Sequence, residues 1–160
     1  MKNMLLSNLN LTDIDKIIAH VRHREYMSGI TRDQLRIKAT SEVFTPTNIV
    51  QLSLDRIPIE SFQDPTKTFL DNSCGDGQFL GEVLIRKIEN GSTFEQALST
   101  IYGVDLMQDN VDLCRERLLC GHEHLRNIVE QNIVCHNALT YNYSFGEPVT
   151  FGNGLFTYDD

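Results

Sequence analysis

The residues best suited to chemistry form the run DNSCGDGQFL at positions 71–80. Its two glycines let the backbone turn sharply and approach a ligand closely. The dinucleotide fingerprint G-x-G-x-x-G would need a third glycine where Leu80 stands. Asp71 and Asp76 would also repel a pyrophosphate, because like charges repel at short range. A cationic or neutral ligand fits better, and S-adenosylmethionine carries an ammonium and a sulfonium but no phosphate.

A second acidic position follows in the segment Gly103-Val104-Asp105, at the end of an apolar run. A carboxylate at the end of a strand can accept hydrogen bonds from both hydroxyls of a ribose. The alternative is that Asp105 caps the helix that follows it. The residues alone leave both interpretations open.

The elements that would position these residues alternate along the chain. Apolar runs predict strands at 67–73, 101–106 and 132–139, and helical spacing predicts helices at 79–90, 94–99, 108–119 and 122–131. Strands separated by helices indicate βαβ units in a parallel sheet. We therefore expect an α/β fold that brings residues 71–80 and Asp105 to the carboxyl edge of one sheet, where ligands bind in such folds.

The two ends of the chain depart from this alternation. Residues 1–40 predict a helical lead, with an amphipathic helix over 11–21 and a second helix around 31–38, and residues 41–160 predict the main domain. Residues 147–160 are β-rich, with a strand at 149–151 and an Asn-Gly pair typical of a hairpin turn.

A further helix is expected soon after the segment EVFTPT, residues 42–47. Thr45 or Thr47 could cap it, and Pro46 suits the start of a helix. Its apolar side would consist of Ile49, Val50, Leu52 and Leu54.

Four segments in order, EVFTPTNIV, FLDNSCGDGQFLGEVL, IYGVDLMQDNV and NIVCHNAL, resemble the N6-adenine DNA methyltransferases of restriction–modification systems and phages. The resemblance covers about residues 36–145. It implies a Rossmann-like class I methyltransferase sheet, here partial, with about four parallel strands. It also implies S-adenosylmethionine as cofactor and DNA as a partner.

The resemblance assigns a role to each matching residue. The methionine end of the cofactor would be held by Phe44, Thr45 and Pro46 and by the loop residues Asp71, Cys74, Gly75, Gly77 and Phe79. Asp105 would bind the ribose. Asn137 stands where the family usually has Asp, and its amide oxygen can still accept from the adenine amino group. The structural alternative places Phe44 and Phe79 in the core and makes Cys74 a small buried filler.

The family's catalytic motif, Asn/Asp-Pro-Pro-Tyr/Phe, is missing from the sequence. In that motif, two oxygens accept the amine hydrogens of adenine and direct its lone pair at the methyl group, while the aromatic ring stacks on the flipped base. The nearest candidate, GNGLF at 152–156, keeps Asn153 and Phe156 but lacks both prolines, which fix the turn. A plain hairpin turn is the favoured interpretation of this segment.

Charge and composition limit the partners. The net charge is −8, with seven Lys/Arg and four Asp/Glu in residues 1–40 against seven and eighteen in residues 41–160. An acidic body argues against a large phosphate-binding surface. With no C-x-x-C pair, no long apolar run and no signal peptide, we expect no metal, no membrane span and a cytoplasmic protein with free thiols.

Three hypotheses about function follow. The first is an adenine-N6 methyltransferase, either minimal or completed by a partner subunit. The second is a cofactor-binding or regulatory module that has lost catalysis. The third is an interaction protein that binds no cofactor. The resemblance also implies that the sheet stops after the fourth strand. The exposed sheet edge would then be covered by the terminal hairpin, by a second copy of the chain or by a partner protein.

Overall fold

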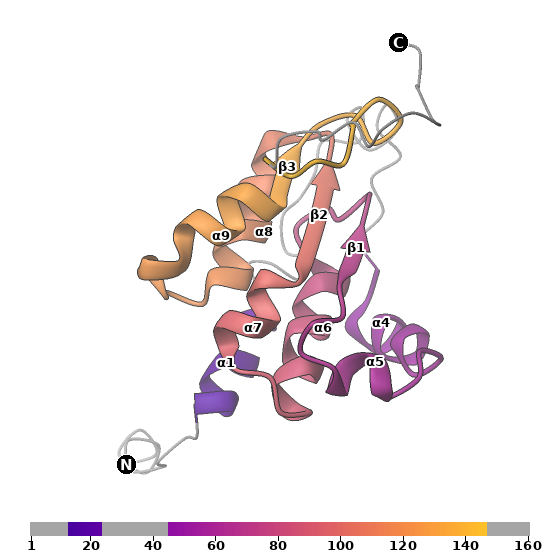
Figure 1. Cartoon of the computed structure of the whole chain (residues 1–160), viewed down its shortest axis with the longest axis vertical. Helices are drawn as coiled ribbons and strands as arrows, with labels where there is room; N and C mark the ends of the chain where they lie inside the picture. The colour runs from indigo at the N-terminus through magenta and orange to yellow at the C-terminus, as the bar shows by residue number, and fades with distance from the viewer. Residues whose placement is uncertain (1–12, 24–44, 147–160) are drawn as a thin grey trace, which may run out of the picture.

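A computed structural model describes residues 13–23 and 45–146 of the chain. Its centre is a parallel sheet of three strands in the order β1-β2-β3, formed by Phe69–Asp71, Ile101–Asp105 and Ile133–Cys135. Asp71 lies opposite Gly103, and Asp105 lies opposite Cys135. All three strands therefore end at one edge, and the α/β fold with a partial Rossmann-like sheet is confirmed (Figure 1).

Two helical crossovers connect the strands. Between β1 and β2 the chain forms α6 (Gln78–Glu89) and α7 (Phe94–Ser99). Between β2 and β3 it forms α8 (Gln108–Leu119), the 3-10 turn η1 (Glu123–Leu125) and α9 (Arg126–Asn132). In Figure 1, α8 and α9 lie on the side of β3, while α4 and α5 lie on the side of β1.

Within residues 13–23 and 45–68, the helices that precede the sheet are α1 (Asp13–Val21), α4 (Thr47–Leu54) and α5 (Glu60–Gln63). Helix α1 buries Ile17 and Val21 and packs on α6 and α8. Helix α4 packs on α6 and buries Val50 and Leu54. Helix α6 also contacts β1 and β2, so it joins the leading helices to the sheet.

Local chemistry explains where several helices begin and end. Thr93 opens α7 with a capping box, in which its hydroxyl accepts from the N–H of Gln96 and the Gln96 side chain accepts from the N–H of Thr93. Helix α6 ends at Glu89 with Asn90 as its C-cap, followed by Gly91 with a positive φ of 107°. These signals are local, which is why the sequence locates both helices.

Three details differ from the sequence predictions. Pro46 itself is the N-cap of α4, with no side-chain cap from a threonine. Ile49 and Leu52, expected on the apolar side of α4, are 45% and 61% exposed. The expected strand at 132–139 ends at Cys135, because Asn137 accepts hydrogen bonds from the N–H groups of Leu139, Thr140 and Tyr141 and turns the chain.

Some predictions lie outside the described residues: the helix at 31–38, the fourth strand at 149–151, the hairpin, and Phe44, Asn153 and Phe156. Within 13–23 and 45–146, no helix combines the length and apolar character that crossing a bilayer requires. The same residues contain no cluster of His, Cys, Asp or Glu able to hold a metal ion. All four cysteines are free thiols.

Candidate functional site

A pocket of about 490 Å³ lies beside the carboxyl end of β1. Its walls are Thr45 just before α4, the end of α4 with the turn after it, strand β1, the glycine loop (residues 72–77) and the first turns of α6. The volume falls in the range of small-molecule sites, roughly 300–1,000 Å³. Most of the lining is apolar, with a few polar groups: Thr45, Ser53, Asp71, Ser73, Asp76 and Gln78. That composition is typical of a ligand site.

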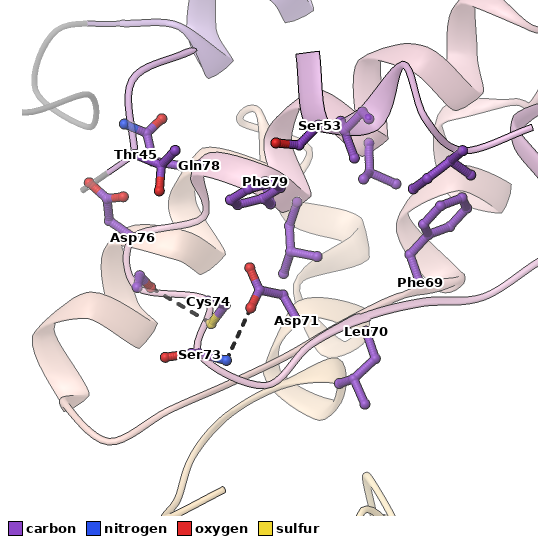
Figure 2. Close-up of a pocket in the computed structure, with 15 residues that line it drawn as sticks. Thr45, Ser53, Phe69, Leu70, Asp71, Ser73, Cys74, Asp76, Gln78 and Phe79 are labelled. Carbon is purple, nitrogen blue, oxygen red and sulfur yellow. Dashed lines mark hydrogen bonds between the residues drawn. The ribbon is translucent and has the colours of Figure 1, made fainter. Parts of the chain in front are cut away.

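Figure 2 shows the side chains of Asp71 and Phe79 pointing into this pocket, with Thr45 on one side and Phe69 on the other. The carboxylate of Asp71 accepts the N–H of Ser73 at 3.0 Å. Burial raises the pKa of Asp71, the hydrogen bond from Ser73 partly opposes the shift, and the charge of Asp105 adds to it. A cation bound here would stabilise the ionised form of Asp71 and so oppose the upward shift of its pKa, which means that the carboxylate favours a cationic ligand.

Asp105 lies next to the pocket and supports the glycine loop. Its Oδ2 accepts the N–H of Gly75 at 2.9 Å, and its Oδ1 accepts the N–H of Met107 at 2.9 Å and the amide of Asn110 at 3.2 Å. The side chain is half-buried. The N-cap of α8 is Met107, so Asp105 is not the N-cap residue of that helix. A carboxylate oxygen has more than one acceptor site, so Oδ2 retains capacity for a further donor.

Cys74 has a structural role in this arrangement. It is buried, its N–H donates to Val104 O at 3.0 Å, and its thiol donates to Gly75 O at 3.7 Å. A hydrogen bond with Cys114 and burial both raise the pKa of the Cys74 thiol. A protonated, buried thiol is a poor nucleophile, so Cys74 contributes packing and loop shape while one side of it lines the pocket.

Two glycines, Gly77 at the end of this loop and Gly103 in β2, lie close to protein side chains. A Cβ at Gly103 would lie 2.9 Å from Cys74 Sγ and 2.9 Å from Leu80 Cδ1. Gly77 has a positive φ of 94°, and a Cβ there would lie 2.9 Å from Cys114 Sγ. The side of Gly77 on which a side chain would stand therefore faces α8, and Gly77 does not line the pocket.

The structure brings many of the predicted site residues together, though not all. Thr45, Asp71, Cys74, Gly75 and Phe79 line one pocket. Pro46 is exposed at the start of α4 and does not line it. Asn137 is exposed two residues beyond β3, and its side-chain oxygen accepts the N–H of Leu139 at 3.0 Å. It lies near Asp105, since the next residue back, His136, donates its N–H to Asp105 O.

Sequence reasoning missed the partner of Asp76 and several lining residues. Asp76 is 2% exposed and pairs with Arg117 of α8, so its charge does not act alone on a ligand. The lining also includes Leu54, Ile57 and Leu80, whose apolar character is visible in the sequence but whose convergence on one pocket is not. Long-range pairing of this kind leaves no local pattern in a sequence.

Comparison with known proteins supplies a family. The family model for N-6 DNA methylase matches residues 25–149 of the chain. No curated protein and no solved structure matches the chain. The matched span includes all three strands, the pocket and Asp105, and it exceeds half of the sequence. The chain therefore belongs to the N-6 DNA methylase family, as its motifs indicate.

Proposed function

We propose that the chain binds S-adenosylmethionine and serves adenine-N6 methylation of DNA. The observation that carries this proposal is the pocket at the end of β1, with Asp71 inside it and Asp105 adjoining it through Gly75. Family members are generally dependent on this cofactor, and the family suggests DNA as the substrate. When bound, the cofactor supplies a methyl group activated by its sulfonium.

The residues fit the chemistry of that ligand. Phe79, Leu54, Ile57 and Leu80 offer apolar contact to a methionine chain, and Asp71 offers a carboxylate to its positive charges. Asp105 would accept hydrogen bonds from the ribose hydroxyls, and Asn137 would accept from the adenine amino group. In this assignment the pocket holds the methionine end, while the ends of β2 and β3 hold the nucleoside.

The chain's own catalytic step would rest on Asn153 and Phe156, which lie outside the described residues. In the proposed reaction, an Asn oxygen accepts a hydrogen of the adenine amine and orients its lone pair, and an aromatic ring holds the extruded base. The alternative is that a partner protein supplies these groups and this chain supplies the cofactor.

The experiment is a methyl-transfer assay on unmethylated DNA with radiolabelled cofactor, using wild type, Asn153→Ala and Asp105→Ala. Transfer by wild type that falls in both variants supports catalysis within the chain. Cofactor binding without transfer supports the partner alternative, which addition of a candidate subunit then tests. Absence of both binding and transfer contradicts the proposal.

A further inference from the structure

A buried cation lies behind the glycine loop. Arg117, in the last turn of α8, is 1% exposed and has the largest volume of the fully buried side chains in the described residues. Its Nη1 lies 3.5 Å from Asp76 Oδ1 and donates to Gln78 Oε1 at 3.2 Å. A charge removed from water is costly unless it is paired and hydrogen-bonded. Removing either partner would therefore leave the other charge buried and without its counter-charge.

Two glycines lie beside this side chain. A Cβ at Gly77 would lie 3.5 Å from Arg117 Cδ, and a Cβ at Gly81 would lie 3.4 Å from the same atom. The aliphatic part of Arg117 thus runs across the loop and the first turn of α6 at ordinary van der Waals distance, whereas the tight approaches are to Cys114 Sγ at 2.9 Å from a Cβ at Gly77 and to Val21 Cγ1 at 2.6 Å from a Cβ at Gly81. Gly77, the second glycine of the C-G-D-G run, lets α8 pack closely on the loop, since a side chain there would point at α8 and not into the pocket.

The two groups that Arg117 contacts also form part of the pocket wall. Asp76 and Gln78 line the pocket together with Thr45, and Figure 2 shows the three on the side away from Phe69. The described lining residues include two carboxylates, Asp71 and Asp76. Since Arg117 pairs with Asp76, Asp71 is the one whose charge Arg117 does not offset. Arg117 therefore influences both the shape of one wall and the net charge of the lining.

We infer that Arg117 is a positioning residue of the site: from α8, it fixes Asp76 and Gln78 and so holds the glycine loop in its ligand-binding conformation. It does not line the pocket and acts through these two residues. The ligand part of this inference rests on the proposed function, whereas the loop part concerns the protein without ligand.

The test compares Arg117→Met with Lys87→Met. Lys87 is a second fully buried cation, whose Nζ donates to Lys67 O at 2.6 Å and which does not line the pocket. Both variants lose a buried charge, so both should be less stable. The first readout is amide hydrogen exchange of residues 74–78 without ligand, measured for each variant at a temperature the same number of degrees below its own thermal unfolding midpoint. The second is the Kd for S-adenosylhomocysteine.

We expect Arg117→Met to speed exchange at Gly75 and Gly77 and to weaken binding by about tenfold, the scale of coupling between contacting residues. Arg117→Lys should recover part of both losses. Lys87→Met should leave loop exchange within about twofold of wild type, because Lys87 contacts Asp64 O, Lys67 O and the ring of Phe69, outside residues 74–78. Since Phe69 lines the pocket, the exchange readout carries the comparison between the two variants.

Equal loop exchange in the two Met variants would overturn the inference and leave Arg117 a purely structural residue. If Arg117→Met does not fold, Asp76→Asn gives the same comparison from the other side of the pair, with faster loop exchange expected and unchanged exchange contradicting the inference. Failure of wild type to bind the ligand would contradict the proposed function, while the exchange comparison would still decide the role of Arg117.

Discussion

Replacing Gly77 by alanine tests whether α8 packs as closely on the glycine loop as the structure indicates. Gly77 is the N-cap of α6 and has φ 94°, a conformation that costs an alanine about 1–2 kcal/mol. The new Cβ would also lie 2.9 Å from Cys114 Sγ. Forcing an extra methyl into a packed site costs about 1–3 kcal/mol. The expected loss is therefore about 2–5 kcal/mol, a large part of a typical stability of about 5–15 kcal/mol.

Gly91 provides a matched control. It has φ 107°, but nothing lies within 4 Å of a Cβ built there. Gly91→Ala should therefore cost only the backbone part, about 1–2 kcal/mol. Urea unfolding followed by circular dichroism would measure both losses, and their difference, about 1–3 kcal/mol, isolates the contact with Cys114.

A second control removes the obstructing atom. In the double variant Gly77→Ala/Cys114→Ala, the Sγ is gone, so the combined loss should be smaller than the sum of the two single losses. If Gly77→Ala and Gly91→Ala are equally destabilised, and the double variant is additive, the close approach of α8 to the loop is wrong.

Two further changes probe the charges around the site. Burial raises the folded-state pKa of Asp71 above its ordinary value of 3.8. Between pH 3.8 and that raised pKa, the native protein binds more protons than the unfolded chain, so the free energy of unfolding of wild type falls as the pH rises through this interval. Asp71→Asn should remove this fall and be more stable than wild type at pH 7, yet bind S-adenosylmethionine more weakly; parallel pH profiles for the two proteins would contradict this. Arg22→Met should lower the free energy of unfolding by about 1.5–3 kcal/mol, because Arg22 donates two hydrogen bonds, of 2.8 and 2.9 Å, to the buried carboxylate of Glu82. Urea titration measures that loss, and an unchanged midpoint would show that Glu82 does not depend on Arg22.

Much of the framework can be predicted because its causes are local. The helix predicted at 108–119 has the observed bounds, since its ends follow from neighbouring residues. Short apolar runs bounded by polar residues predict the strands that end in Asp71 and Asp105. The alternation of strands and helices predicts parallel pairing, and parallel pairing places both aspartates at the same edge of the sheet.

What the sequence could not provide depends on contacts between distant residues. The sequence suggests that the charge of Asp76 faces a ligand, but Arg117 from another helix neutralises it. Ile49 and Leu52 are expected to be buried because they are apolar, whereas only Val50 and Leu54 of that set are buried in the structure. The motif suggests that Gly77 contacts the ligand, but the space it leaves is filled by α8. In each case the neighbour that decides the role is supplied by tertiary packing.

Calorimetric titration of the protein with S-adenosylmethionine and, separately, S-adenosylhomocysteine tests directly whether this edge of the sheet binds the cofactor. The comparison uses wild type, Asp105→Ala and the control Asp112→Ala, which removes the same charge from an exposed position on α8. We expect wild type and Asp112→Ala to bind in the micromolar range and Asp105→Ala to lose binding. Absence of binding by wild type, or equal binding by all three proteins, would contradict the assignment of this edge of the sheet as the cofactor site.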